Sequence, residues 1–180
     1  MKIGPIDTDK EILIIAEIGN NHEGDFAVAK KMIASAAKAG AQAVKFQTIV
    51  PQKLVSPTLK EATAMLSKFQ FSSQQFAELK KVADAKGVMF LSTPFDTESV
   101  KQLDPLVPAF KIASGDNNYW PLIEAVAKTG KPILLSTGMA DFNAIMQTRK
   151  HIETLWGREK TERDLAILHC VSLYPTPPEE

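Results

Sequence analysis

Residues 132–138 read PILLSTG, a short apolar run that ends in two hydroxyl residues and a glycine. Runs of the same kind lie at residues 12–19, 41–48, 88–95, 108–114 and 165–171. Each run is bounded by glycine, proline or polar residues. Continuous apolar runs of this length are typical of strands buried on both faces of a parallel sheet. The sequence therefore predicts six such strands.

Segments with helical spacing of apolar residues separate these runs. They cover Phe26–Ala39, Ser73–Lys86, Thr97–Leu103, Pro121–Thr129 and Asp141–Leu155. Asp25 and Ser72 are the candidate N-caps, and glycines follow three of the helices. Alternation of strands and helices predicts right-handed βαβ units around a parallel sheet.

We expect an α/β fold: a TIM-type (β/α)₈ barrel, here incomplete, as a single domain over residues 1–180. A closed barrel typically has about 250 residues, so about six βα units fit, ending before strands seven and eight. A doubly wound open sheet is the alternative. Against it, GNNHEGD after the first strand is not the dinucleotide-binding fingerprint.

The bulk composition excludes several classes of partner. The chain has 21 Lys and Arg against 21 Asp and Glu, so it has no electrostatic footprint for nucleic acid or an anionic membrane. No apolar run approaches the roughly 20 residues of a membrane helix, and no signal peptide is recognisable. The single cysteine, Cys170, is interpreted as a small buried packing residue. We expect a soluble cytoplasmic protein.

Two connections are long. Residues 49–71 follow the second predicted strand, and we expect them either to cover a site at that rim or to form a surface excursion. Residues 156–164, WGREKTERD, are charged and are interpreted as solvated surface on the opposite rim.

Polar residues follow nearly every apolar run, at the strand ends where barrels place their catalytic groups. Lys45 and Gln47 are two apart and face the same side of a strand, so their even-numbered neighbours face the helices. Buried lysines are costly unless paired, so Lys45 and Lys111 need partners such as Glu17 or an anionic substrate. The alternative is that both lysines reach solvent at the strand ends. Their occurrence together with Glu17 favours a site.

Six motifs in the chain, in this order and spacing, resemble the sialic acid synthase family, which includes N-acetylneuraminate, legionaminate and pseudaminate synthases. They are IAEIGNNHEGD, AVKFQT, STPFD, FKIASGD, KPILLSTGM and HCVSLYPTP, and they extend from Ile12 to Pro177. The resemblance implies condensation of phosphoenolpyruvate with the open-chain aldehyde of an N-acetylated amino sugar. The products are a nine-carbon 2-keto sugar acid and phosphate.

The resemblance also implies roles for individual residues. Lys45 and Lys111 would hold the carboxylate and phosphate of phosphoenolpyruvate, Glu17 would do acid–base or water-orienting work, and Tyr174 would close one side of the site. The expected substrate-binding residues are Gln47, Thr93, Ser114, Asp116, Ser136, Ser172 and His22.

Three of these residues leave a question open: the preferred sugar for two of them and the role for the third. Ser172 stands where the family often has asparagine, and Asp116 where it usually has glutamate, which puts the sugar preference in question. For His22, a substrate contact and a structural role within its loop stay open.

The resemblance further implies a divalent metal, Mn or Mg, for the full-length enzyme. Its histidine ligands, and an antifreeze-like domain that covers the site of a homodimer partner, would lie outside this chain, so we expect the 180 residues alone to be inactive. Two alternatives stay open. One is a non-catalytic barrel fragment that binds phosphate or phosphoenolpyruvate. The other is an aldolase that uses Lys45 or Lys111 as a Schiff base.

Overall fold

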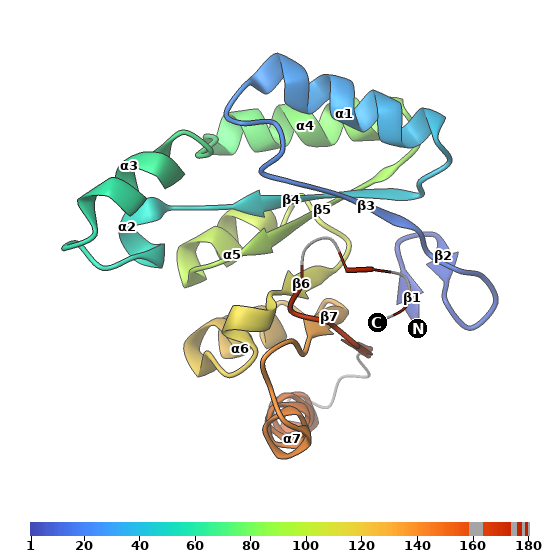
Figure 1. Ribbon diagram of the computed structural model, residues 1–180. Coiled ribbons are helices and arrows are strands. Elements are labelled where there is room, and N and C mark those ends of the chain that lie inside the picture. Colours follow the sequence, from blue (N-terminus) through green and yellow to red (C-terminus); the bar gives the residue numbers. More distant parts are fainter. Residues whose placement is uncertain (159–163, 174–175, 178, 180) are drawn as a thin grey trace.

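The computed structural model describes residues 1–158, 164–173, 176–177 and 179. Six strands follow one another in chain order in two neighbouring three-stranded sheets, which together we call the wall (Figure 1). They are β3 (Ile15–Gly19), β4 (Ala43–Thr48), β5 (Met89–Pro94), β6 (Phe110–Ile112), β7 (Ile133–Ser136) and β8 (Leu165–Leu168). The hydrogen-bonded pairs within β3-β4-β5 and within β6-β7-β8 are all parallel, and β5 lies beside β6.

The α/β fold with parallel sheets is therefore confirmed. A doubly wound sheet reverses its strand order at a switch point, whereas the strand order here follows the chain. This order favours the barrel architecture. Within the described residues β3 and β8 do not pair with each other, so the wall is open between them.

Helices cover the outer face of this wall. They are α1 (Phe26–Lys38), α4 (Ser73–Ala85), α5 (Thr97–Leu103), α6 (Trp120–Ala127) and α7 (Phe142–Arg158). Helices α1 and α4 lie together over β3, β4 and β5 (Figure 1). The two predicted caps are present, since the Asp25 side chain accepts from the backbone of Ala27 and Val28, and Ser72 forms a capping box with Gln75. No helix in the described part of the chain is long and apolar enough to span a membrane.

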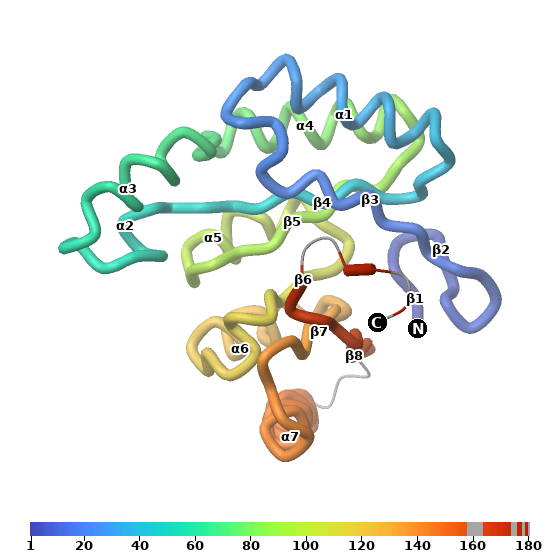
Figure 2. Tube along the Cα trace, viewed as in Figure 1, coloured from blue at the N-terminus to red at the C-terminus, as the bar shows by residue number. Residues whose placement is uncertain are grey.

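The N-terminal residues form a small antiparallel hairpin that the sequence did not reveal. Strands β1 (Lys2–Ile3) and β2 (Ile6–Asp7) are only two residues long, too short to show a period. Figure 2 shows the hairpin beside the start of β3. Its buried side chain, Ile3, lies with inward-facing apolar residues of β4, β5 and β7 and with Ala109 just before β6. This apolar layer comprises Ile3, Ala43, Leu91, Ala109 and Leu134.

Two predicted boundaries are wrong. The first strand begins at Ile15 and not at Ile12, since Ile12 and Ile14 are exposed. Residues 156–158 belong to α7, and Trp156 is only 6% exposed because it packs in the core between the strands and helices. The charged residues around Trp156 hid this contact in the sequence. Residues 159–163 of the predicted solvated stretch lie outside the described residues.

The segment 49–71 contains α2 (Pro51–Leu54) and α3 (Lys60–Ser67), which extend beyond the end of β4 (Figure 2). Near its start, Lys53 forms ion pairs with Asp96 and Glu98 at the beginning of α5. At its end, the Phe71 ring stacks on His22 in the loop after β3, with 4.4 Å between ring centroids. The segment is thus fixed to neighbouring rim loops at both ends, and it is not a free surface excursion.

Candidate functional site

Alternate residues of the strands face the inside of the wall, and their chemistry changes along the strand. At the amino ends these residues form the apolar layer. At the carboxyl ends they are polar. We call this second set the lysine cluster; it comprises Glu17, Lys45, Thr93, Lys111 and Ser136. The predicted direction of Lys45 is confirmed, because Val44 and Phe46 pack in the core under the helices.

Lys45 connects three neighbouring strands. Its register partner on β3 is Glu17, and its Nζ lies 2.5 Å from Glu17 Oε2. The same Nζ donates to Thr93 Oγ1 on β5 at 2.9 Å. Lys45 is 7% exposed, whereas the Glu17 side chain is 53% exposed. The ammonium is therefore held below the rim by a carboxylate that solvent and ligands can still reach.

Lys111 lies further along the wall and has no carboxylate within ion-pair distance among the described residues. Its Nζ donates to Ser136 Oγ at 2.5 Å and to the carbonyl of Ile112 at 2.8 Å. Burial, and after it the positive charge of Lys45, lower the pKa of Lys111 to about 8, while the charges of Cys170 and Glu17 act in the opposite direction. The two lysines thus influence each other inside the wall. Two ammonium groups against one carboxylate leave a positive charge that an anion would balance.

The loop after β7 brings three further segments together. Gly138 N donates to Ser114 Oγ at 3.1 Å. A Cβ on Gly138 would lie 2.8 Å from Ser114 Oγ and 3.2 Å from Ser172 Oγ, so a side chain at this position would need its neighbours to move. The hydroxyls of Ser114 and Ser172 therefore meet beside the loop that begins at Ser136. Hydroxyls and backbone N–H groups gathered beside a lysine are the donors that bind a phosphate or carboxylate.

Cys170 is the residue that the sequence interpretation missed. It is half-buried next to the loop after β7 and is not a fully buried packing residue. Burial alone would raise the pKa of the Cys170 thiol. Hydrogen bonds from Ser136, the Thr137 backbone, Ser114 and the Gly138 backbone outweigh burial and lower it. Its even-numbered parity, shared with Ser172, was the one signal in the sequence.

Three further residues that were predicted for the site are not members of the lysine cluster. Asp116 follows β6 in a short 3₁₀ turn (η1, Ser114–Asp116), and its partial burial raises the pKa of its carboxyl. Gln47 lies on β4, two residues beyond Lys45, and accepts a hydrogen bond from Asn20. Tyr174 lies outside the described residues.

His22 is placed among packing residues and not in the lysine cluster. It is 1% exposed, and its Nδ1 accepts from Gly24 N at 3.0 Å. Burial also lowers the pKa of its imidazole, so the neutral form is favoured. Together with the stacking on Phe71, these contacts match the structural role that the sequence had left open.

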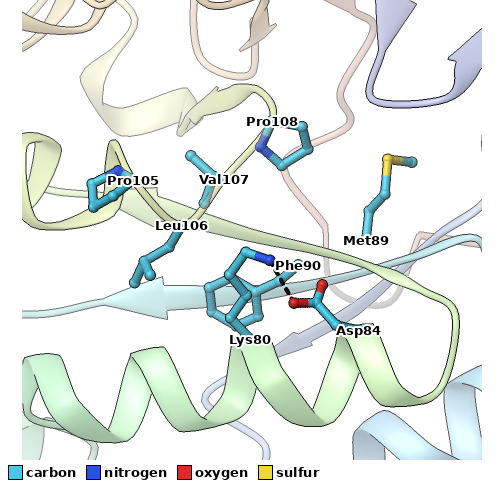
Figure 3. Close-up of a pocket in the computed structure, with 8 residues that line it drawn as sticks. All are labelled: Lys80, Asp84, Met89, Phe90, Pro105, Leu106, Val107 and Pro108. Carbon is cyan, nitrogen blue, oxygen red and sulfur yellow. Dashed lines mark hydrogen bonds and ion pairs between the residues drawn. The ribbon is translucent and has the colours of Figure 1, made fainter.

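A separate cavity of about 280 Å³ lies at the opposite end of the strands. Figure 3 shows its lining, which includes Met89 at the start of β5, Pro108 before β6, and the Lys80–Asp84 ion pair on α4. The Lys80 amine and the Asp84 carboxylate neutralise each other at 2.6 Å. This cavity holds none of the converging donors found around Lys111.

The described residues do not fit a divalent metal. Among them no group of three His, Cys, Asp or Glu side chains lies close enough to hold an ion. Three protein ligands are the usual minimum for a catalytic site. The chemistry that follows from the described residues is therefore anion binding and proton handling.

Known proteins resemble this chain over nearly all of its length. A model of the NeuB family matches residues 32–180. The N,N'-diacetyllegionaminic acid synthase of Campylobacter jejuni is 38% identical over 93% of this chain and 54% of its own length. The human N-acetylneuraminate-9-phosphate synthase is 34% identical over 93% of this chain and 48% of its own length.

Solved structures agree with these relatives. The crystal structure of N-acetylneuraminic acid (sialic acid) synthetase from Leptospira borgpetersenii serovar Hardjo-bovis, in complex with citrate, superimposes with a TM-score of 0.86 at 32% identity. The superposition covers 99% of this chain and 61% of that one. The chain spans about half the length of the curated relatives it matches.

Proposed function

The chain belongs to the NeuB family, and from this premise we propose that it carries the phosphoenolpyruvate site of a sugar acid synthase. The enzyme would condense phosphoenolpyruvate with an N-acetylated amino sugar to give a nine-carbon 2-keto acid and phosphate. The observation that carries the proposal is the convergence of Lys45 and Lys111, from separate strands, on the inside of one wall. The names of the relatives as sugar acid synthases support the same class of product.

Phosphoenolpyruvate has two anionic groups, and the site offers two sets of donors. Lys45 with Thr93 would bind one group, and Lys111 with Ser136 and the loop after β7 would bind the other. Donors that are already held by neighbouring strands need little reorganisation when charge develops on the substrate. The pKa of Lys111 would rise on binding, because an anion replaces part of its lost hydration.

In the proposed reaction the enol carbon of phosphoenolpyruvate attacks the sugar aldehyde and forms the new carbon–carbon bond. Water then adds to the resulting oxocarbenium carbon, and the tetrahedral intermediate releases phosphate as its carbon–oxygen bond breaks. Glu17 is the residue placed to orient that water or accept its proton, since its carboxylate is exposed at the rim and anchored to Lys45.

The remaining components would come from outside the described residues. A divalent metal such as Mn or Mg, which would polarise the aldehyde when bound, has no ligand set in the part of the chain described. We propose that other residues supply it and that the intact protein acts as a cytoplasmic homodimer. The partner substrates are phosphoenolpyruvate and an N-acetylated amino sugar.

The direct test is phosphate release by the intact protein that carries this chain. It would be incubated with phosphoenolpyruvate, Mn or Mg, and a panel of N-acetylated amino sugars including N-acetylmannosamine. Sugar-dependent phosphate release supports the proposal. Phosphoenolpyruvate binding without turnover on any sugar would instead support a non-catalytic anion-binding protein.

One observation favours a second candidate. A lysine with a pKa near 8 has more neutral amine at neutral pH than an ordinary lysine, and a neutral amine can form a Schiff base with a carbonyl substrate. This reading makes the protein an aldolase that uses Lys111. Borohydride treatment in the presence of pyruvate would trap a covalent adduct on Lys111 in that case, and no adduct if the lysine binds an anion.

A further inference from the structure

We infer that Asn20 is a positioning residue that decides which end of the Gln47 amide faces the open site, and thereby which amino sugar is accepted. The inference rests on the proposed function, because it takes Gln47 to contact the sugar. Asn20 follows Gly19 at the end of β3, and Gln47 lies near the end of β4.

The two amides form one hydrogen bond. Asn20 Nδ2 donates to Gln47 Oε1 at 2.6 Å. Gln47 shares the inner face of the wall with Lys45 and is in register with Thr93 on β5. Since its Oε1 is engaged by Asn20, the Gln47 side chain has its NH₂ group left for a ligand. No other residue of the described chain accepts from this NH₂ group.

A buried atom fixes this orientation. Asn20 Oδ1 is fully buried and has no hydrogen-bond partner among the described residues. If both amides turned over, the buried unpartnered group would be the Asn20 NH₂, with two N–H donors in place of one carbonyl. Buried N–H groups without partners are rarer in proteins than under-satisfied carbonyl oxygens. The observed arrangement is therefore favoured, and it points the Gln47 donors away from Asn20.

The backbone leaves room where these donors lie. Gly19 has a φ of +53°, and a Cβ built on it would be 3.3 Å from Glu17 Oε1 and 3.8 Å from Gln47 Nε2. Because Gly19 has no side chain, the space between the carboxylate and the amide nitrogen stays open. An N–H donor beside this space suits an uncharged oxygen of the sugar, either a hydroxyl or the N-acetyl carbonyl.

Replacing the donor on residue 20 by an acceptor tests the inference. In Asn20→Asp the carboxylate can only accept, so the Gln47 amide should turn over and present its oxygen to the sugar. We expect the KM for the amino sugar to rise by roughly 10- to 100-fold, the range for a mispaired buried polar contact, while the KM for phosphoenolpyruvate changes less than about twofold. Asn20→Leu, which removes the hydrogen bond without forcing a flip, should give a smaller rise.

Two further variants show whether Asn20 acts through Gln47. Gln47→Glu keeps an acceptor for Asn20 but presents a second oxygen to the sugar, so it should reproduce the rise in sugar KM even if Asn20→Asp fails to fold. In a Gln47→Ala background, Asn20→Asp should add little. An unchanged sugar KM in both Asn20→Asp and Gln47→Glu would overturn the inference, and so would an equal loss with and without the Gln47 side chain.

A structural readout separates this inference from the proposed function. NMR of the intact protein can follow exchange of the Gln47 side-chain NH₂ protons with solvent. We expect fast exchange in the wild type, and slow exchange in Asn20→Asp, where these protons would be hydrogen-bonded. If no amino sugar is turned over but the exchange changes as expected, the proposed function fails while the positioning role stands. Slow exchange in the wild type would contradict the positioning role directly.

Discussion

The amino and carboxyl ends of the strands differ in the chemistry of their inward-facing side chains. At the amino ends, the inner face is packed by the apolar layer of Ile3, Ala43, Leu91, Ala109 and Leu134, to which the β1–β2 hairpin contributes Ile3. At the carboxyl ends, the lysine cluster places two ammonium groups and one exposed carboxylate on that same face. The amino ends stabilise the fold through apolar burial. The carboxyl ends hold charges below the rim, which costs free energy because the charges lose hydration.

Lys111 and Leu134 show this difference at two neighbouring positions. They are register partners on β6 and β7 and both face inward. The lysine extends to Ser136 at the carboxyl end, and the leucine joins the apolar layer. Neighbouring positions should therefore give opposite mutational effects, one on catalysis and one on stability.

The largest effect is expected for Lys111→Ala in the intact protein. Removing a preorganised charge that contacts the substrate should lower kcat/KM for phosphoenolpyruvate by about 10²- to 10³-fold. The melting temperature should hardly change, because the variant also removes a buried charge that is not paired with any carboxylate in the described part of the chain. Phosphate release and thermal unfolding would be measured on one preparation. Wild-type turnover, or loss of folding, would contradict the assignment of Lys111 to substrate binding and not to stability.

The matched change at the other end is Leu134→Ala. We expect it to destabilise the protein by about 2–3 kcal/mol, the lower part of the range for buried leucines. Leu134 borders a cavity of about 250 Å³ near the hairpin, so neighbouring side chains have room to relax. Denaturant unfolding measures the loss, and kcat/KM below the transition should stay within about twofold of the wild type. A severe loss of activity in a folded variant would show that the two ends are not separable.

Much of the difference between the amino and carboxyl ends of the strands could be predicted from the sequence. The period of two in a strand was enough to place Lys45 and Gln47 on one face and Phe46 on the other. The N-cap Asp25 and the stop at Gly40 followed from local chemistry, since an Asp side chain can accept from N–H groups at the helix start and Gly40 has a φ of +93°.

The rest depends on contacts between distant segments. The β1–β2 hairpin has too few residues for a pattern, and only the packing of Ile3 against residues of distant strands makes it part of the fold. Trp156 lies in a charged stretch but is buried on α7. Cys170 gains its chemistry from Ser136 and the loop after β7, which are more than 30 positions away, and no local signal reports such neighbours.

The pKa of Lys111 predicts how phosphoenolpyruvate affinity depends on pH. Its pKa of about 8 means that the free protein loses this positive charge as the pH rises through that value. Since the charged form binds the anion, phosphoenolpyruvate affinity should fall roughly tenfold between pH 7 and 9. Lys111→Arg keeps its charge over this range, so whatever affinity it retains should not fall in this way. Equal pH profiles for the two proteins would contradict the assignment.

The smallest effect concerns Cys170. Its lowered pKa predicts alkylation by iodoacetamide at a lower pH in the folded protein than in the unfolded chain. Mass spectrometry of the peptide that contains Cys170 would follow the reaction. Bound phosphoenolpyruvate should slow it a few-fold, and Ser136→Ala should move the pH profile upward, because one hydrogen bond to the thiolate is lost. A folded protein that reacts only at the pH of the unfolded chain would show that Ser136 and the loop after β7 do not stabilise the Cys170 thiolate.

The central claim is that Lys45 and Lys111 bind one and the same anionic substrate, and calorimetric titration of the intact protein with phosphoenolpyruvate tests it most directly. The titration would compare the wild type, Lys45→Ala, Lys111→Ala and the double variant. We predict that each single change weakens binding by about tenfold or more, and that the double variant loses less than the product of the two single losses, as expected for residues that share a ligand. Wild-type affinity in either single variant would show that the two lysines do not share one anion.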